Sequence, residues 1–325
     1  MAFRLKLVPD NTKFDFFRWA SVTFGGSVAL VIAGIIVTLI MGLNFGIDFR
    51  GGTTIRTEST QAVDVGAYRT AIQPLNLGDV SITEVYDPTF RADQHVAMIR
   101  IQAQEGDEAI TPETIATIEG ALQAVDPSVT FPSVESVGPK VSGELIKTAV
   151  LSVLAGVIGI CVYIWLRFEW QFSLGAVVSL IHDIALTIGI FSLFQIKFDL
   201  TIIAALLTIL GYSINDTVVV FDRLRENLIK YKTMPLRDVM NLSVNETLSR
   251  TVMTSGTTLI ALIALLVLGG DVIRGFVFAM TWGVIVGTYS SVYVAKNVVL
   301  FLGVKRDWSK PEDSPAGTRF AEGGK

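Results

Sequence analysis

Long apolar runs follow one another along most of the chain, separated by short polar segments and one long insertion. Each run has roughly 20 to 25 residues, enough for a helix to cross about 30 Å of hydrocarbon at about 1.5 Å per residue. The pattern therefore predicts six transmembrane helices, at residues 22–43, 145–166, 172–194, 198–221, 251–269 and 275–302.

The first apolar run has basic residues in front of it, as a signal peptide would. It is longer than the roughly 7–15 residues of a signal-peptide core, and no small-x-small cleavage site follows it. We therefore expect a retained signal anchor, preceded by an N-terminal segment at residues 1–21. The sixth run is followed by a polar tail at residues 303–325.

The overall composition agrees with this pattern. Hydrophobic residues make up 51% of the 325 residues, charged residues 17%, and the mean hydropathy is +0.55. Soluble chains carry about 25% charged residues, and disordered chains combine low hydrophobicity with high net charge, so both classes are excluded. The net charge of −4 gives no general affinity for nucleic acid. A single cysteine, Cys161, excludes an intramolecular disulfide and a cysteine zinc site, and two histidines leave little for another metal site.

Basic residues concentrate on one side of the predicted helices. The first 20 residues hold four Lys or Arg, and the connector at residues 222–250 holds six. The links on the opposite side hold one each, Lys197 and Arg274. The positive-inside rule therefore predicts that both termini and the connector are cytoplasmic, with residues 44–144 outside.

The long insertion, residues 44–144, has the pattern of a small α+β domain. Its acidic residues number fifteen against six basic ones, which is typical of a solvated surface and, less often, of a face for basic clients. The order β-α-β-β-α-β is the split βαβ or ferredoxin-like pattern, and no catalytic constellation occurs in it. The expected elements are strands at 53–58, 79–86, 96–103 and 129–137, and helices at 61–75 and 112–124.

Three ionisable residues lie inside or at the edge of the predicted helices. Asp183 follows His182 in the third helix, Asp216 lies in the cytoplasmic half of the fourth, and Arg250 begins the fifth. A charge in mid-bilayer costs about 2.5 to 10 kcal/mol depending on the method, so such residues are functional candidates. If the helices pack together, Asp216 and Arg250 meet at one depth, and movement of the arginine would change the proton affinity of the carboxylate. The alternatives are a static buried pair, or an arginine that extends to the interface.

Two further features have simpler expectations. Lys296, near the cytoplasmic end of the sixth helix, is expected to extend its amine to the interface. The connector at 222–250 is predicted to form two cytoplasmic helices, and apolar residues recur every four positions in the second one. This spacing suits a helix that lies on the membrane surface. The recurring residues are Leu236, Met240, Val244 and Leu248.

Four motifs in order along the chain are similar to those of the SecD/SecF family of protein-export membrane proteins, in its SecF form. The resemblance covers roughly residues 15–305. Three of the motifs begin at Val137, Gly211 and Ser249 and run to Leu145, Asn227 and Ser255. The first motif is Asn44–Thr53, directly after the first predicted helix.

Glycines in the first two motifs bracket the insertion where it meets the membrane. Glycine permits backbone conformations and close approaches that other residues resist. We therefore interpret these motifs as structural hinges rather than client-binding sites, with Asp48 and Arg50 close enough in sequence to pair. The hinge candidates are Gly46, Asp48, Arg50, Gly51, Gly52, Gly138 and Pro139.

The resemblance implies a fold, partners and an energy source. The family belongs to the resistance-nodulation-division superfamily, whose members use twelve spans in two related halves, so six spans form one half. It implies SecD, the SecYEG channel, YajC, YidC and the translocating preprotein as partners, and the ATPase SecA indirectly. It also implies a place in the bacterial inner membrane. Protons are the implied coupling ion in late export steps, with Asp216 and Arg250 at the matching positions and Asp183 at a third.

Two other functions remain open. The chain carries no nucleotide-binding loop of the G-x-x-x-x-G-K-[ST] kind, and we expect neither an enzyme nor a cofactor. A small-molecule or lipid exporter of the same superfamily would have a larger outside domain with an apolar pocket. A purely structural subunit would stabilise the channel without moving protons.

Overall fold

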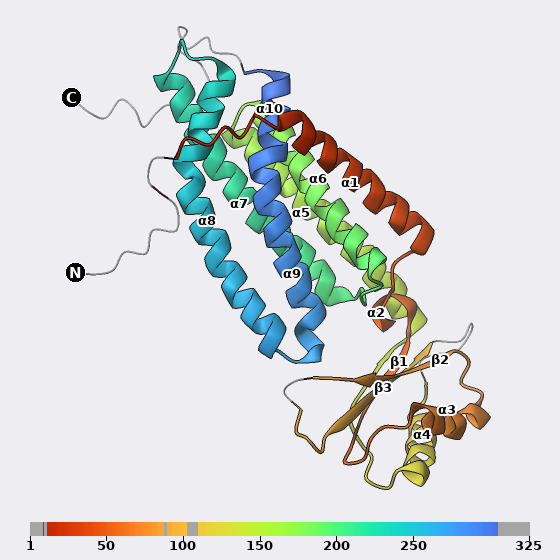
Figure 1. The fold of residues 1–325 in the computed structure, drawn as a ribbon. Helices are drawn as coiled ribbons and strands as arrows, with labels where there is room; N and C mark the ends of the chain where they lie inside the picture. The colour runs from red at the N-terminus through yellow and green to blue at the C-terminus, as the bar shows by residue number, and fades with distance from the viewer. Residues whose placement is uncertain (1–8, 10–11, 88–89, 103–109, 305–325) are drawn as a thin grey trace, which may run out of the picture.

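The computed structural model describes residues 9, 12–87, 90–102 and 110–304 of the chain. Within these residues, six helical spans are long and apolar enough to cross a membrane, as the apolar runs predicted. Figure 1 shows them side by side in one bundle, with a small domain at one end. The helices are α1 (Ala20–Met41), α5 (Pro139–Arg167), α6 (Trp170–Leu193), α7 (Leu200–Lys230), α8 (Leu236–Leu268), and α9 (Asp271–Ser290), which continues through the π-helical turn η2 (Ser291–Ala295) into α10 (Lys296–Leu302).

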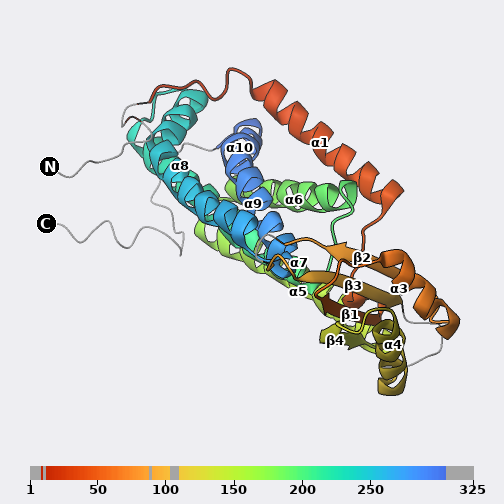
Figure 2. The ribbon, with the colours of Figure 1, turned by 60° about the horizontal axis from the view of Figure 1, so that its bottom comes forward.

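The centre of the bundle is formed by α6, α7 and α9. These helices bury about half of their apolar stretches inside the protein, whereas α1, α5 and the apolar half of α8 stay largely exposed. Figure 2 shows α1 at the edge of the bundle, where it packs along α6. The two backbones touch because each has a glycine at the crossing: a Cβ on Gly189 would lie 2.7 Å from the Cα of Gly34. Because α6, α7 and α9 lie at the centre of the bundle, the side chains between them are covered by other parts of the protein.

The insert domain, residues 47–138, has the predicted ferredoxin-like order. It begins with a single turn, α2 (Ile47–Arg50), and its sheet has the strand order β2-β3-β1-β4 with every neighbouring pair antiparallel. The two longer helices cover one face of this sheet, where Ile55, Ile99 and Ile118 are completely buried. The elements are β1 (Gly52–Ser59), α3 (Val65–Ile72), the 3₁₀ turn η1 (Gln73–Leu75), β2 (Val80–Val85), β3 (His95–Gln102), α4 (Pro112–Val125) and β4 (Thr130–Val137).

A buried carboxylate joins the end of β1 to the turn between α4 and β4. Asp126, 6% exposed, follows α4 and accepts hydrogen bonds from the Ser59 hydroxyl and, at 2.7 Å, from the Ser128 hydroxyl. Burial alone would raise the pKa of Asp126, but these hydrogen bonds to its charged form outweigh burial and lower that pKa. Burial, reinforced by the nearby charge of Asp126, raises the pKa of Tyr68 to about 12.

The prediction for the connector at 222–250 was partly wrong. Its residues do form two helical stretches, but these are continuations of the spanning helices, because α7 continues unbroken to Lys230 and α8 begins at Leu236. The apolar stripe does not lie on the membrane surface: Met240 and Val244 are 1% exposed and pack against neighbouring parts of the protein. Polar side chains favour this antiparallel extension, since Arg223 on α7 bonds Glu246 on α8 at 2.7 Å.

Candidate functional site

Asp183 connects the three central helices through its carboxylate. It lies on α6 with no exposed surface. One oxygen, Oδ2, accepts hydrogen bonds from the Ser213 hydroxyl of α7 at 2.6 Å and from the Ser290 hydroxyl of α9 at 2.8 Å. The other oxygen lies 2.9 Å from Nδ1 of His182, whose ring stacks on Tyr289 of α9 with 6.2 Å between ring centroids. Every oxygen of this buried carboxylate therefore has a partner, as the burial of a charge requires.

Asp216 lies on α7 one turn beyond Ser213 and is also buried, with 3% of its surface exposed. Within the described part of the chain, its carboxylate has one hydrogen-bonding neighbour, the Ser255 hydroxyl of α8, at a long 3.5 Å. That hydroxyl is itself 2.7 Å from the Thr288 hydroxyl of α9. The Asp216 carboxylate is therefore much more weakly bonded than that of Asp183.

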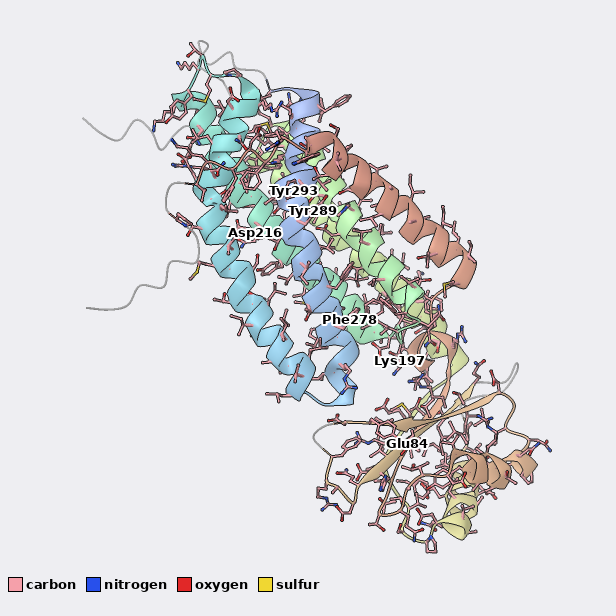
Figure 3. All side chains as sticks on the ribbon, in the orientation of Figure 1. Glu84, Lys197, Asp216, Phe278, Tyr289 and Tyr293 are labelled. Atoms are coloured by element: carbon pink, nitrogen blue, oxygen red, sulfur yellow. The ribbon has the colours of Figure 1, made fainter. Side chains whose placement is uncertain are left out.

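The two carboxylates belong to one polar cluster in the bundle. Ser213 and Asp216 are three residues apart on α7 and so lie on one face of that helix. Figure 3 shows Asp216 and Tyr289 in the half of the bundle that is farther from the insert domain. We call this group the polar cluster; its members are Asp183, Ser213, Asp216, Ser255, Thr288 and Ser290.

Arg250, the third candidate, does not join the polar cluster in this structure. Its side chain is exposed on α8, and no ion pair with Asp216 occurs within the described residues. Ser255, which contacts Asp216, lies five residues farther along α8, about 7.5 Å along the helix axis. The arginine is therefore about one and a half turns from the carboxylate's hydroxyl partner, at the edge of the bundle.

The hinge candidates lie where the insert domain meets the bundle. Gly51 and Gly52 have φ of 72° and 126°, values that favour glycine, and they connect α2 to β1. Asp48 and Arg50 form no ion pair among the described residues; the Asp48 carboxylate instead accepts a hydrogen bond from the Leu200 amide of α7 at 3.0 Å. Gly138 precedes α5 with an ordinary extended backbone, and Pro139 is its first residue, a position at which proline is favourable.

The prediction for Lys296 was wrong. Its side chain is 1% exposed, and its amine lies over three aromatic rings: 4.2 Å from the centroid of Phe17, 4.8 Å from Phe16 and 5.2 Å from Tyr293. The aromatic residues before α1 thus cover the lysine, and cation–π attraction replaces water around it. The aromatic residues before α1 are the only feature of the sequence that could have indicated that Lys296 is buried.

Sequence reasoning did not predict which hydroxyls bond the carboxylates. Ser213 had a usable signal, since it lies one helical turn from Asp216. Ser290 and Thr288 lie on a different helix, and nothing in their local sequence says that they face α6 and α8. Among the described residues there is no group of three or more His, Cys, Asp or Glu side chains that could hold a metal ion.

The fold and the polar cluster together define a class of protein: a polytopic membrane protein with a six-helix bundle, a ferredoxin-like insert and two carboxylates buried at its centre. Residues 117–305 match the family described as "Protein export membrane protein SecD/SecF, C-terminal", and residues 36–63 match "SecD/SecF GG Motif". The chain therefore belongs to the SecD/SecF family of protein-export membrane proteins, and within it to the SecF subunits.

Relatives and solved structures agree with this assignment. "Protein translocase subunit SecF" of Cereibacter sphaeroides is 73% identical over 321 residues, which cover 99% of each chain. The protein of that name from Rhodobacter capsulatus is 68% identical, over 97% of this chain and 96% of its own. The crystal structure of SecDF, a translocon-associated membrane protein from Thermus, has a TM-score of 0.80 at 35% identity. The match covers 91% of this chain but 39% of the SecDF chain.

Proposed function

We propose that this chain is a proton-coupled subunit of the protein-export machinery, in which Asp216 takes up and releases the coupling proton. The observation that carries the proposal is the contrast between two buried carboxylates on neighbouring helices. Asp183 has hydrogen-bond partners on both oxygens, whereas Asp216 has one hydroxyl at 3.5 Å. A buried anion without partners is costly, and a proton removes that cost.

The proton would act by changing which hydrogen-bond and charge partners the Asp216 side chain needs. The neutral acid needs one acceptor and has no charge to satisfy, while the anion needs donors or a nearby cation. Ser255 of α8 supplies a donor, and Arg250 of the same helix supplies a cation about one and a half turns from that hydroxyl. Alternation between the two forms therefore favours two different positions of α8 relative to α7. The role given to Arg250 is to approach the anion.

The chain would work with SecD as the second half of a twelve-span assembly. The solved SecDF chain extends far beyond the part that this chain matches, which supports a partner half. The family resemblance adds SecYEG, YajC, YidC, the preprotein and, indirectly, SecA. The place is the bacterial inner membrane, with the insert domain in the periplasm. Basic residues at the bundle end away from that domain support this orientation: Arg167, Arg223, Lys230 and Arg237.

The test is gradient-driven export in inverted membrane vesicles that contain the complete export machinery. Replacing Asp216 by Asn keeps the size of the side chain but removes the titratable proton, so we expect the stimulation by a proton gradient to be lost. Asp222→Asn is the matched control: it makes the same change six residues along α7, where the carboxylate is half exposed and pairs with Arg167. Full stimulation in the Asp216 variant would support the structural-subunit alternative instead.

A further inference from the structure

The segment that leads into the sheet of the insert domain is bonded to the segment that leads into α7. Residues 44–51, which we call the entry segment, lie beside the α6–α7 turn, residues 194–199. The Phe198 amide donates to the Asn44 carbonyl and the Gly46 amide donates to the Phe198 carbonyl, both at 2.8 Å. The Asn44 side chain also donates to the Gln195 carbonyl at 2.8 Å. Two segments about 150 residues apart in sequence are thus joined like a short piece of parallel sheet.

Asp48 extends this connection to the first residue of α7. Its carboxylate accepts from the Leu200 amide at 3.0 Å, while Asp199 caps the following two amides of the helix. The first amides of a helix have no partner within it, and the positive end of the helix dipole favours a negative charge there. Asp48 therefore bonds α7 itself rather than only the turn before it.

Aromatic packing makes the joint compact. Phe45 and Phe49 of the entry segment lie 6.0 Å from Phe198, centroid to centroid, and Phe191 of α6 lies 6.1 Å from Phe198 on another side. A side chain at Gly46 would crowd the turn: its Cβ would lie 3.0 Å from the Lys197 side chain and 3.2 Å from Asp199, so these neighbours would have to shift by a few tenths of an ångström. Figure 3 shows Lys197 at this junction between the bundle and the insert domain. A displacement of the turn must therefore move the entry segment with it.

Beyond the joint, the entry segment runs directly into the middle of the sheet. It ends at Gly51, and β1 begins at Gly52 and lies between β3 and β4. At its other end, α7 carries Ser213 and Asp216. From Leu200 to Asp216 is about 24 Å along one uninterrupted helix, which can move as a unit. One continuous path thus runs from the buried carboxylate to the central strand of the insert domain.

We propose that Asp48 is a positioning residue that transmits movements of α7 to the insert domain. The proposal rests on the proposed function, because it takes the protonation of Asp216 as the event that moves α7. The entry segment is then a coupling element, and the two glycines after α2 let the sheet change its angle. A structural hinge would only allow the insert domain to move. In this proposal the entry segment makes that domain move when α7 moves.

The test measures one distance in four chains. The full chain, with its SecD partner in lipid nanodiscs, has Cys161 replaced by Ser and carries spin labels at Ala116→Cys on α4 and Val28→Cys on α1, both exposed positions. Pulsed electron paramagnetic resonance then gives the distance distribution with Asp216 intact and with Asp216→Asn, the neutral mimic. Both are repeated with Asp48→Ala. We expect Asp216→Asn to shift the distribution, and Asp48→Ala to reduce that shift at least threefold.

Two variants separate coupling from simple loss of structure. Asp48→Asn keeps an acceptor oxygen and should restore the shift, and Arg50→Ala, two residues along, should leave it intact. If Asp48→Ala cannot be recovered folded, Asn44→Ala removes only the bond to Gln195 and should reduce the shift about twofold. An undiminished shift in Asp48→Ala or, in its place, in Asn44→Ala overturns the inference but leaves the proposed function standing. No shift with Asp48 intact, together with normal gradient-driven export in Asp216→Asn, overturns both.

Discussion

Two buried carboxylates, one turn apart in depth, are held in opposite ways in this protein. Asp183 contacts the hydroxyls of α7 and α9 and the ring of its neighbour His182, all within 2.9 Å. Asp216 contacts one hydroxyl at 3.5 Å, although its surface is almost as completely covered. Burial alone therefore does not tell which carboxylate changes state. We infer it instead from the number and length of their hydrogen bonds.

The difference suggests a division of labour. A fully bonded carboxylate fixes the helices that supply its donors, because moving any of them leaves a buried polar group unpaired. A poorly bonded carboxylate places no such constraint on its neighbouring helix, so the two helices can shift against each other when the charge of the carboxylate changes. On this view Asp183 makes α6, α7 and α9 one unit. A change in the charge of Asp216 moves that unit relative to α8, so α7 moves together with α6 and α9.

The largest expected effect is the loss of Asp183. Asp183→Ala leaves the Ser213 hydroxyl without its acceptor and removes one of the two acceptors of the Ser290 hydroxyl, so we expect it to lower the free energy of unfolding by about 3–5 kcal/mol. Asp216→Ala removes the same atoms from the same helix bundle and should cost less than half as much. The measurement is a denaturation curve of both variants in one detergent. Equal losses at the two positions would mean that their hydrogen bonds do not differ in strength as the geometry indicates.

A smaller effect is expected at a third carboxylate, which lies outside the membrane-spanning helices. Asp126 resembles Asp183 in being bonded by hydroxyls, and its pKa is lowered in the folded domain. Its stabilisation is present above the unfolded pKa of about 3.8 and is lost as the pH falls through the folded pKa. We expect Asp126→Ala to cost about 1–3 kcal/mol at neutral pH and progressively less below pH 3.8.

Hydrogen exchange of β1 and β4, corrected for the intrinsic rate at each pH, measures this stability in the full chain. A cost that stays constant from neutral to acid pH would show that the charge of Asp126 contributes nothing.

Local patterns were enough to predict the insert domain. The alternation at 79–86 and the helical spacing at 112–124 are decided by neighbours in sequence, and β2 and α4 occupy nearly those ranges. Thr111 is the N-cap of α4, and its hydroxyl accepts a hydrogen bond from the Thr114 amide. A hydroxyl residue directly before Pro112 is a local sequence pattern that favours such a cap. The number of membrane spans followed equally well from length and hydropathy.

Contacts between helices could not be predicted in the same way. Lys296 resembled any lysine near a helix end, and only the fold shows that Phe16 and Phe17 return over it. Ser290 is one of many serines, and its importance depends on the rotation of α9 against α6. Asp48 is close enough in sequence to pair with Arg50, whereas its actual partner, the Leu200 amide, is 152 residues away. Charge and hydropathy mark a residue as costly to bury, but packing decides what it meets.

We propose that the Asp216 carboxylate is the one that changes protonation. Infrared difference spectroscopy of the full chain with its partner in lipid detects the carbonyl stretch of a protonated carboxylic acid as the pH is changed. We expect one such titrating band in the wild type, which disappears in Asp216→Asn and remains in Asp183→Asn. A titrating band that survives in Asp216→Asn and is lost in Asp183→Asn would contradict it.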